Sequence, residues 1–354
     1  MKSLRILSLP VFLFITFFIV SCGNSKRNQT VLNVEFVNHD AGKKIDILIG
    51  GKLFTSFCWP ENVYKPILYP VYTSSGTEIT RGFPLNPREG EQTDHLHQVG
   101  IWLNYGNVNG LDFWGNGYRG FKEPKGGEIK HLRIESLSDK SGTGSFVSVE
   151  SWLKPDGKEL LSERTIYSFS AKGNLRIVDR ITTLTASDTT VMFKDTKEGM
   201  FGIRVARQLE MPSSQGVILI DNLGKPSAEK DTLNSGVSGN YVSSEGLKGD
   251  AVWGTRAKWM DLYGNIKGEK ISVVICDHHE NPGYPTYWHA RGYGLFAANP
   301  FGWKDFTKGK ESFNFNIPAG KSSTFRYRII ISSGVHLTDN EINAYSDEFN
   351  KEYK

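Results

Sequence analysis

The stretch VLNVEFV, residues 31–37, carries Leu, Val and Phe at every second position from Leu32 to Phe36. Successive side chains of a β-strand point to opposite faces of the sheet, so this alternation is typical of a half-buried antiparallel strand. Four further stretches have strand-like alternation: HLRIESL (131–137), FVSVESWL (146–153), LRIVDRITTL (175–184) and FRYRIIIS (325–332). Their recurrence predicts an all-β protein.

Turn signals separate the predicted strands. They are Ala-Gly-Lys at 41–43, Ser-Gly at 141–142, Pro-Asp-Gly at 155–157, Lys-Gly-Asn at 172–174 and Pro-Ala-Gly at 318–320. Short strands and turns at this spacing are typical of a large antiparallel β-sandwich. All-β domains often exceed ~200 residues, so we predict one sandwich domain over residues 31–335. Within it, residues 221–250 are rich in Gly, Ser and Asp and are predicted to form a long loop.

One helix is predicted, in residues 336–354. Thr338 and Glu341 have the spacing of a capping box, in which a hydroxyl and a carboxylate satisfy the first amides of a helix. Apolar residues then follow at helical spacing, at Ile342, Tyr345 and Phe349. We expect this helix to pack on the sandwich without a chemical role.

Residues 1–21 are predicted to be a lipoprotein signal peptide. A positive start is followed by an apolar run from Ile6 to Val20, which is shorter than the ~20 residues that span a bilayer. Cys22 stands where a lipoprotein carries its acylated cysteine, and residues 22–30 would be a flexible tether. We therefore expect an exported protein that faces the periplasm or the cell surface and meets the membrane only through its lipid anchor. An ordinary signal peptide with a coincidental cysteine is the alternative.

The chain without its leader is nearly neutral. Lys2 and Arg5 are the charged residues of the leader, and 40 basic and 38 acidic residues remain after it, a net charge of +2. No basic block suggests a nucleic-acid partner. Cys58 and Cys276 lie in apolar, strand-like runs, which favours buried free thiols over a disulfide.

The stretch DHLHQVGIWLNYGNVNGLDFWG, residues 94–115, concentrates groups that can bind or react. If residues 93–105 form a strand, His95 and His97 lie two positions apart and share one face. Two such imidazoles could ligate a metal, or one could act as a general acid or base near neutral pH. The alternative is a structural pair that bonds to the backbone near a strand end.

The second half of the same stretch predicts a ligand surface. Asn104, Asn109 and Asp112 offer hydrogen-bonding groups on Gly-punctuated turns, and Trp114 offers a flat apolar face. A sugar has hydroxyl edges and apolar C–H faces, so this combination suits a carbohydrate or another small polyhydroxylated ligand. The alternative is that Trp102 and Trp114 are core residues, which is the commoner role of tryptophan.

A second segment, MFKDTKEGMFGIRVARQ at 192–208, could supply a carboxylate. Glu198 precedes a glycine at a predicted strand break, where its side chain could be aimed into a cleft as a base. Arg204 could hold an anionic or hydroxyl-rich substrate. The alternative is an Arg–Glu surface pair of little energetic consequence.

A third segment, residues 276–303, adds further histidines. If residues 287–289 form a strand, His289 faces away from Trp288, and Arg291 follows two residues later. No Gly-x-Ser-x-Gly elbow, phosphate-binding loop or dinucleotide fingerprint accompanies these residues.

Three motifs, DHLHQVGIWLNYGNVNGLDFW, KEGMFGIRVA and PTYWHARGYGLFAANPFG, together resemble the PmoA-like family of exported bacterial proteins, labelled "methane oxygenase PmoA". The resemblance covers most of residues 60–335. The label implies a membrane-embedded subunit, but no apolar run of ~18 residues follows the leader, so methane oxygenase activity is not expected. The resembling pattern is Asp-His-Pro-His-His. Here Leu96 and Gln98 replace the proline and the third histidine, which makes a non-catalytic role more credible.

The chain also looks similar to galactose-mutarotase-like supersandwiches. In those proteins a sugar lies on the concave face of a large sheet, between a histidine acid and a carboxylate base. The resemblance implies the same architecture and a carbohydrate ligand here, as a fold-level analogy.

We therefore expect a carbohydrate-active protein that performs acid/base chemistry on a sugar, of the epimerase, lyase or hydrolase type. His97 and His289 are the acid/base candidates, with Glu198 as their carboxylate partner. The candidate substrate-binding residues are His95, Asn104, Asn109, Asp112, Trp114, Arg204 and Arg291. No cofactor is expected. The alternatives are a non-catalytic carbohydrate-binding lipoprotein and a metal-dependent enzyme with zinc or iron on His95, His97, His289 and Glu198.

Overall fold

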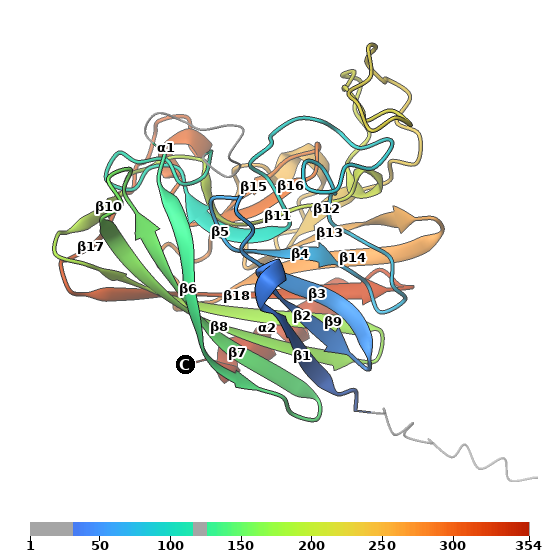
Figure 1. Cartoon of the computed structure of the whole chain (residues 1–354). Helices are drawn as coiled ribbons and strands as arrows, with labels where there is room; N and C mark the ends of the chain where they lie inside the picture. Colours follow the sequence, from blue (N-terminus) through green and yellow to red (C-terminus); the bar gives the residue numbers. More distant parts are fainter. Residues whose placement is uncertain (1–30, 116–125, 354) are drawn as a thin grey trace, which may run out of the picture. The chain divides into compact units, whose positions relative to one another are not determined.

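Two large antiparallel sheets form the fold (Figure 1), in a computed structural model that describes residues 31–115 and 126–353. The first sheet has the order β1 (Val34–His39), β2 (Lys44–Ile49), β3 (Lys52–Cys58), β4 (Ile67–Val71), β5 (Ile101–Tyr105), β11 (Gly199–Arg204), β16 (Leu295–Asn299) and β15 (Tyr287–Ala290). The second has the order β12 (Asn240–Ser243), β13 (Trp259–Ile266), β14 (Glu269–Asp277), β18 (Ser322–Ser333), β9 (Leu175–Ala186), β8 (Glu159–Lys172), β7 (Thr143–Leu153) and β6 (Glu128–Ser138). A small sheet pairs β10 (Val191–Phe193) with β17 (Phe315–Ile317).

The alternating stretches of the sequence all lie in these strands. The five predicted strands fall within or overlap β1, β6, β7, β9 and β18, and the predicted turns lie between strands. The predicted all-β sandwich with a short C-terminal helix is therefore confirmed. Period-two alternation is a local property of the chain, which explains why it could be read without knowledge of the strand order.

Aromatic side chains fill the space between the two large sheets. Phe57 on β3 and Phe146 on β7 have ring centres 5.3 Å apart. Phe201 on β11 stacks on Tyr327 of β18 at 4.8 Å. These contacts fix the inner face of the first sheet.

The outer face of the first sheet carries its own apolar cluster. On β16, Phe296 and Ala298 belong to the core between the sheets, whereas Leu295 and Ala297 point the other way and pack with Trp102 of β5. A strand that is apolar on both faces is covered on both faces. Here the outer cover consists of loops.

The C-terminal helix α2 (Asp339–Glu352) packs against the outer face of the second sheet. Thr338 is its N-cap and forms the predicted capping box with Glu341. Ile342 and Phe349 are buried against residues of β9, β13, β14 and β18. The remaining helical elements are short: α1 (Trp303–Phe306) and the 3-10 turns η1 (Asp40–Gly42), η2 (Arg207–Leu209) and η3 (Gly249–Val252).

Residues 210–239, here called the arm, form a long irregular segment between η2 and β12 that stands out from the sheets (yellow in Figure 1). Backbone hydrogen bonds of Ile220 with Glu91 and with Gly90, both 2.8 Å, tie the arm to the chain before β5. The predicted loop over 221–250 is confirmed in its first part. It is wrong at Asn240–Ser243, where β12 pairs with β13, and at its last two residues, where η3 begins.

The predicted signal peptide over 1–21, the acylation of Cys22 and the tether over 22–30 lie outside the described residues and stay predictions. In the described part of the chain, no helix is both long enough and apolar enough to cross a membrane. Cys58 and Cys276 are free thiols, as predicted, with Cys276 fully buried.

Candidate functional site

A pocket of about 520 Å³ opens on the outer face of the first sheet, beside β5, β11 and β15. Its lining residues are His95, His97, Gln98, Asp112, Trp114, Gly115, Lys197, Glu198, His289, Arg291 and Tyr293. These residues come from all three segments that the sequence singled out. The pocket therefore brings together side chains that are nearly 200 positions apart in the chain.

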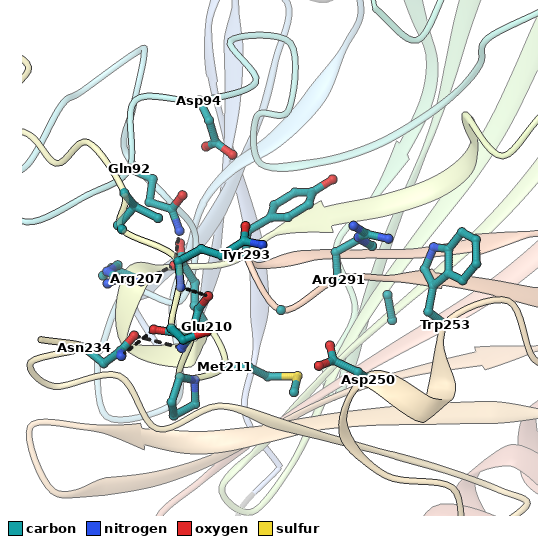
Figure 2. Close-up of a pocket in the computed structure, with 18 residues that line it drawn as sticks. Gln92, Asp94, Arg207, Glu210, Met211, Asn234, Asp250, Trp253, Arg291 and Tyr293 are labelled. Carbon is teal, nitrogen blue, oxygen red and sulfur yellow. Dashed lines mark hydrogen bonds and ion pairs between the residues drawn. The ribbon is translucent and has the colours of Figure 1, made fainter. Parts of the chain in front are cut away.

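A second pocket of about 690 Å³ lies next to the first (Figure 2). Arg291 and Tyr293 line both pockets. The first pocket holds the three candidate acid/base residues, so it is the candidate catalytic pocket.

His289 reaches this pocket because of strand alternation on β15. Trp288 points into the core between the sheets, and His289 points outward, as predicted. The Nδ1 atom of His289 lies 2.8 Å from the carbonyl oxygen of Lys197. A carbonyl only accepts hydrogen bonds, so Nδ1 carries the proton and Nε2 keeps its lone pair. Burial lowers the pKa of His289 to about 4, while Glu198 acts in the opposite direction.

Glu198 stands immediately before β11, which begins at Gly199, where the sequence predicted a strand break. A Cβ at position 106 would lie 2.6 Å from the Cβ of Glu198, so Gly106 allows the two backbones to approach. The amide of Gly106 donates to the carbonyl of Glu198 at 2.7 Å. The carboxylate of Glu198 pairs with Lys197 Nζ at 2.5 Å and is about one-third exposed. Its oxygens thus remain accessible from the pocket.

His95 and His97 do not lie on a strand. The predicted strand over 93–105 is wrong, because only Ile101–Tyr105 is extended and paired, and His95 has a φ of +44°. The two rings nevertheless meet, with centres 5.7 Å apart. His95 also stacks in parallel on Tyr293 at 4.8 Å. A turn, rather than a strand face, brings the two histidines together.

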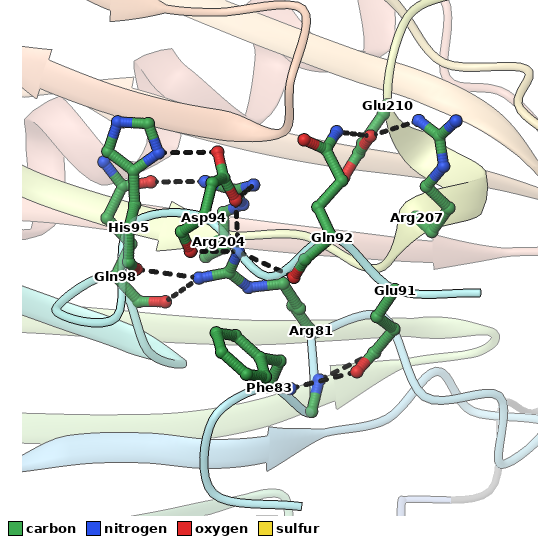
Figure 3. Close-up of polar contacts among 11 residues, drawn as sticks. Arg81, Phe83, Glu91, Gln92, Asp94, His95, Gln98, Arg204, Arg207 and Glu210 are labelled. Carbon is green, nitrogen blue, oxygen red and sulfur yellow. Dashed lines mark hydrogen bonds and ion pairs between the residues drawn. The ribbon is translucent and has the colours of Figure 1, made fainter. Parts of the chain in front are cut away.

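Arg81 determines the shape of this turn (Figure 3). Its side chain is fully buried, and its terminal nitrogens donate to the carbonyls of Gln92, Asp94, His95 and Gln98 at 2.8–3.3 Å. It also forms an ion pair with the carboxylate of Asp94 at 2.6 Å. A buried guanidinium with five donors satisfies backbone acceptors that a strand ladder would otherwise satisfy.

Arg204 and Asp94 extend this network beneath the pocket. Arg204 donates to Asp94 Oδ1 and to Gln98 Oε1, each at 2.6 Å, and its guanidinium lies 4.8 Å from the ring centre of Tyr293. Burial alone would raise the pKa of Asp94, but Arg204, His95 and Arg81 outweigh it and hold that pKa well below its usual range. Asp94 is therefore ionised across the neutral and mildly acidic range.

His97 lies among positive charges. Burial, followed by Lys65 and His95, lowers the pKa of His97 to about 2. The Lys65 amine donates to the carbonyl of His97 at 2.6 Å and lies 5.0 Å from the ring centre of Trp102. His97 is consequently a neutral imidazole at physiological pH.

Several predicted binding residues lie elsewhere. Asn104 is fully buried and donates to the carbonyl of Phe113, and Asn109 hydrogen bonds to the backbones of Thr190 and Met192. Neither asparagine lines the catalytic pocket. Arg204 acts from beneath it, through Asp94 and Gln98. The two asparagines thus stabilise loops, in contrast to the ligand contacts expected from their position on turns.

Asp112 and Trp114 do line the pocket. Asp112 accepts hydrogen bonds from the amides of Trp114 and Gly115 at 2.8 and 2.9 Å, which closes a tight turn. Trp114 is almost completely buried and packs against Trp102 at 5.3 Å. The alternative prediction, that Trp114 is a core residue, therefore fits most of its side chain.

The proposed metal ligands do not form a metal-binding cluster. Within residues 31–115 and 126–353, no group of three or more His, Cys, Asp or Glu side chains could hold a metal ion. Two of the proposed ligand nitrogens are already used within the protein, because Nδ1 of His95 lies on Asp94 and Nδ1 of His289 lies on a carbonyl.

Sequence reasoning missed Arg81, Lys65, Lys197 and Tyr293. Arg81 and Lys65 lie in irregular segments, where no periodicity marks a residue as buried. Lys197 could have been suspected from its position beside Glu198. Tyr293 lies in the turn between β15 and β16. Its position two residues after Arg291 was the feature of the sequence that could have identified it.

The sequence model of one family, described as "Family of unknown function (DUF6807)", matches residues 44–347. The chain belongs to DUF6807. This assignment corrects the predicted PmoA-like family, which does not match the chain. The three motifs behind that resemblance lie within the DUF6807 match, and Gln98, interpreted as a lost histidine, is a buried acceptor for Arg204. No curated protein matches the sequence.

Several solved structures are similar to this DUF6807 chain. They include the galactosidase domain of the alpha-galactosidase–sucrose kinase AgaSK (9% identity, 84% of this chain and 41% of that one, TM-score 0.39), a galactose mutarotase-like protein from Clostridium acetobutylicum (10%, 85% and 99%, 0.35) and galactose 1-epimerase from Lactobacillus acidophilus (11%, 86% and 100%, 0.35). The chain spans less than half of the AgaSK chain. At these identities and TM-scores, the similarities assign no activity to it.

Proposed function

We propose that this protein binds a carbohydrate in the catalytic pocket and transfers protons at the sugar ring, in a reaction of the epimerase, lyase or hydrolase type. The observation that supports this most directly is the convergence of His97, Glu198 and His289 on one pocket. Three proton-handling groups from three distant segments are expected of an acid/base site.

His289 is the proposed general base. Its Nδ1–H is tied to the carbonyl of Lys197, so Nε2 is the atom that accepts a proton from a sugar. The carboxylate of Glu198 favours the protonated imidazole and would stabilise it as the proton arrives. His97, which is neutral, would donate or accept a hydrogen bond, and Arg291 would bind sugar hydroxyls.

The composition of the pocket favours an enzyme over a passive binder. A binding module needs amides and open aromatic faces, but Asn104 and Asn109 are used in loop contacts and Trp114 is almost fully buried. The lining is instead rich in ionisable side chains. Clusters of ionisable groups with shifted pKa values are typical of catalytic sites.

A two-step experiment tests the proposal. The purified protein is first screened by thermal shift against monosaccharides and oligosaccharides, because a ligand of the folded state raises its melting temperature. Each hit is then incubated with the protein in D₂O, and ¹H NMR follows epimerisation, elimination or hydrolysis. We expect turnover that falls ~10²–10⁴-fold in His289→Gln. Binding without turnover would favour the non-catalytic alternative, and a screen without hits would contradict both.

We also propose that the protein is exported and anchored through Cys22. The support is the sequence of the leader alone. Cells grown with labelled palmitate should incorporate the label into the wild-type protein but not into Cys22→Ser. Equal labelling of both proteins would rule out this anchor.

A further inference from the structure

The second pocket continues the catalytic pocket. Two chain segments line both: residues 92–98, held by Arg81, and residues 289–293, which turn from β15 towards β16. The hydroxyl of Tyr241 fixes the latter segment through hydrogen bonds to the carbonyls of Arg291 and Leu295, at 3.2 and 3.1 Å. The two pockets are thus held in a fixed relation by shared, well-bonded backbone.

Arg291 lines both pockets, and Figure 2 shows it in the second pocket between Tyr293 and Trp253. Its guanidinium lies 5.6 Å from the ring centre of Trp253 and 5.8 Å from that of Tyr293, and the side chain is exposed. In the described part of the chain it has no carboxylate partner. Two aromatic rings therefore position a guanidinium whose donors remain available to a ligand that spans the junction.

The second pocket has a built polar wall. The carboxylate of Glu210 is buried and accepts hydrogen bonds from Arg207, at 2.5 Å, and from Gln92. Asp250, from η3, is exposed into the same pocket, and its side chain has no hydrogen bond or ion pair with any described residue. Two acceptors of this wall have no partner among the described residues: Oε1 of Glu210, which is buried, and the carboxylate of Asp250, which is exposed. The exposed acceptor and the guanidinium of Arg291 suit a neutral ligand that is rich in hydroxyl groups.

Each of the two pockets is large enough to hold a sugar unit by itself. Small-molecule pockets usually enclose roughly 300–1,000 Å³, and each of these two falls within that range alone. A single sugar unit in the catalytic pocket would leave the second pocket and Asp250 unused. A second, linked unit would fill it and would place the linkage at Arg291.

We infer that the substrate is an oligosaccharide of at least two units, with one unit in the catalytic pocket and the next in the second pocket, where Asp250 and the arm contact it. This inference rests on the proposed function. It adds to it a second sugar subsite and a substrate class, and it makes Arg291 the residue that binds both units.

The test compares matched sugars of increasing length by isothermal titration calorimetry: glucose, cellobiose and cellotriose; glucose, maltose and maltotriose; galactose, galactobiose and galactotriose. In at least one series we expect the disaccharide to bind the wild-type protein about tenfold more tightly than the monosaccharide. Two variants act on the second pocket. Asp250→Ala removes its free acceptor, and Ser214→Trp fills its space from an exposed position on the arm.

Both variants should reduce the ratio of disaccharide to monosaccharide affinity to less than about threefold. The ratio is the readout, because a general loss of folding lowers both affinities together. Matched controls are Asp188→Ala and Leu223→Trp, at exposed positions that line neither pocket, and they should keep the wild-type ratio.

Equal affinities for a monosaccharide and its disaccharide in every series that binds would overturn the second subsite. So would a tenfold ratio that survives in both Asp250→Ala and Ser214→Trp. Monosaccharide binding in either case would leave the proposed function standing. If no sugar of any length binds, the proposed function itself fails.

Discussion

Two groups of polar and charged residues lie at the catalytic pocket, and they differ in how completely they are bonded. The closed network consists of Arg81, Asp94, Arg204 and Gln98, where each terminal guanidinium group and the Asp94 carboxylate is bonded within the protein. The open group consists of Glu198, His289 and Arg291.

The open group keeps bonding capacity towards the pocket. Among the described residues, Glu198 has one ion pair at a partly exposed position, Nε2 of His289 has no hydrogen-bond partner, and Arg291 has aromatic neighbours without a carboxylate partner. Residue type alone does not separate the two groups, since both contain an arginine and a carboxylate. What separates them is where bonding capacity remains. In the closed network the Nε–H groups of Arg81 and Arg204 lack a partner among the described residues but are buried, whereas the open group keeps donors and acceptors at the pocket surface. The closed network therefore stabilises the turn, and the open group is available to a ligand.

The largest effect is expected from breaking the closed network. Arg81→Met would remove four hydrogen bonds to backbone carbonyls and leave Asp94 without one of its partners. We expect the free energy of unfolding to fall by about 3–5 kcal/mol, the range for loss of one partner of a buried ion pair. Urea denaturation measures this change.

Arg164→Met is the matched control for Arg81→Met. Arg164 pairs with Glu135 at the surface, at 2.7 Å, with both side chains substantially exposed. Its loss should cost less than about 1 kcal/mol. Equal effects of the two substitutions would mean that the Arg81 contacts do not stabilise the turn.

Acid should change the contribution of His289, in the open group, to the free energy of unfolding, while Asp94, in the closed network, keeps its charge. The expected change is smaller than that of Arg81→Met. The pKa of His289 is about 4 in the folded protein and about 6.5 in the unfolded chain, so the unfolded chain binds the extra proton between these values. The stability that His289 contributes is complete above pH 6.5 and is lost as the pH falls towards 4. Asp94 stays ionised over this range, because its pKa lies well below it.

We therefore expect His289→Gln to lose about 2 kcal/mol less stability than the wild type between pH 7 and pH 5. Urea denaturation of both proteins at the two pH values provides the comparison. Asp277, whose pKa burial raises to about 7, has the opposite pH dependence, but it is present in both proteins and cancels in the difference. Parallel pH profiles would show that His289 is not held neutral by the fold.

The contrast between the groups also explains what the sequence could predict. His289 was placed correctly because strand alternation is local, and β15 turns it away from Trp288. His95 and His97 were assigned to a strand because the residues around them are compatible with one. Arg81, 11–17 positions earlier, captures the carbonyls of that segment and forces a turn. A contact of this kind leaves no periodic signal in the sequence.

Gln98 was misinterpreted for a related reason. As a replacement for a histidine it suggested a lost catalytic group, yet its amide oxygen accepts from the buried Arg204 at 2.6 Å. The partner is more than 100 residues away, so neither the spacing nor the residue type identified it. The convergence of the three segments on one pocket could be anticipated, whereas the network that shapes the pocket could not.

The smallest change in stability is expected at Glu198 of the open group. Glu198→Gln would remove the ion pair with Lys197, which is partly exposed, and should lower the free energy of unfolding by less than about 1 kcal/mol. Glu135→Gln, at the exposed pair with Arg164, is its control and should have a similar effect.

The two substitutions should differ in activity. Glu198→Gln loses the carboxylate that favours protonated His289, so turnover of a substrate identified in the screen should fall about 10²-fold, whereas Glu135→Gln should retain it. A loss of several kcal/mol in Glu198→Gln would place Glu198 in the closed network, because stability that depends on a side chain shows that its bonding capacity is already used within the fold.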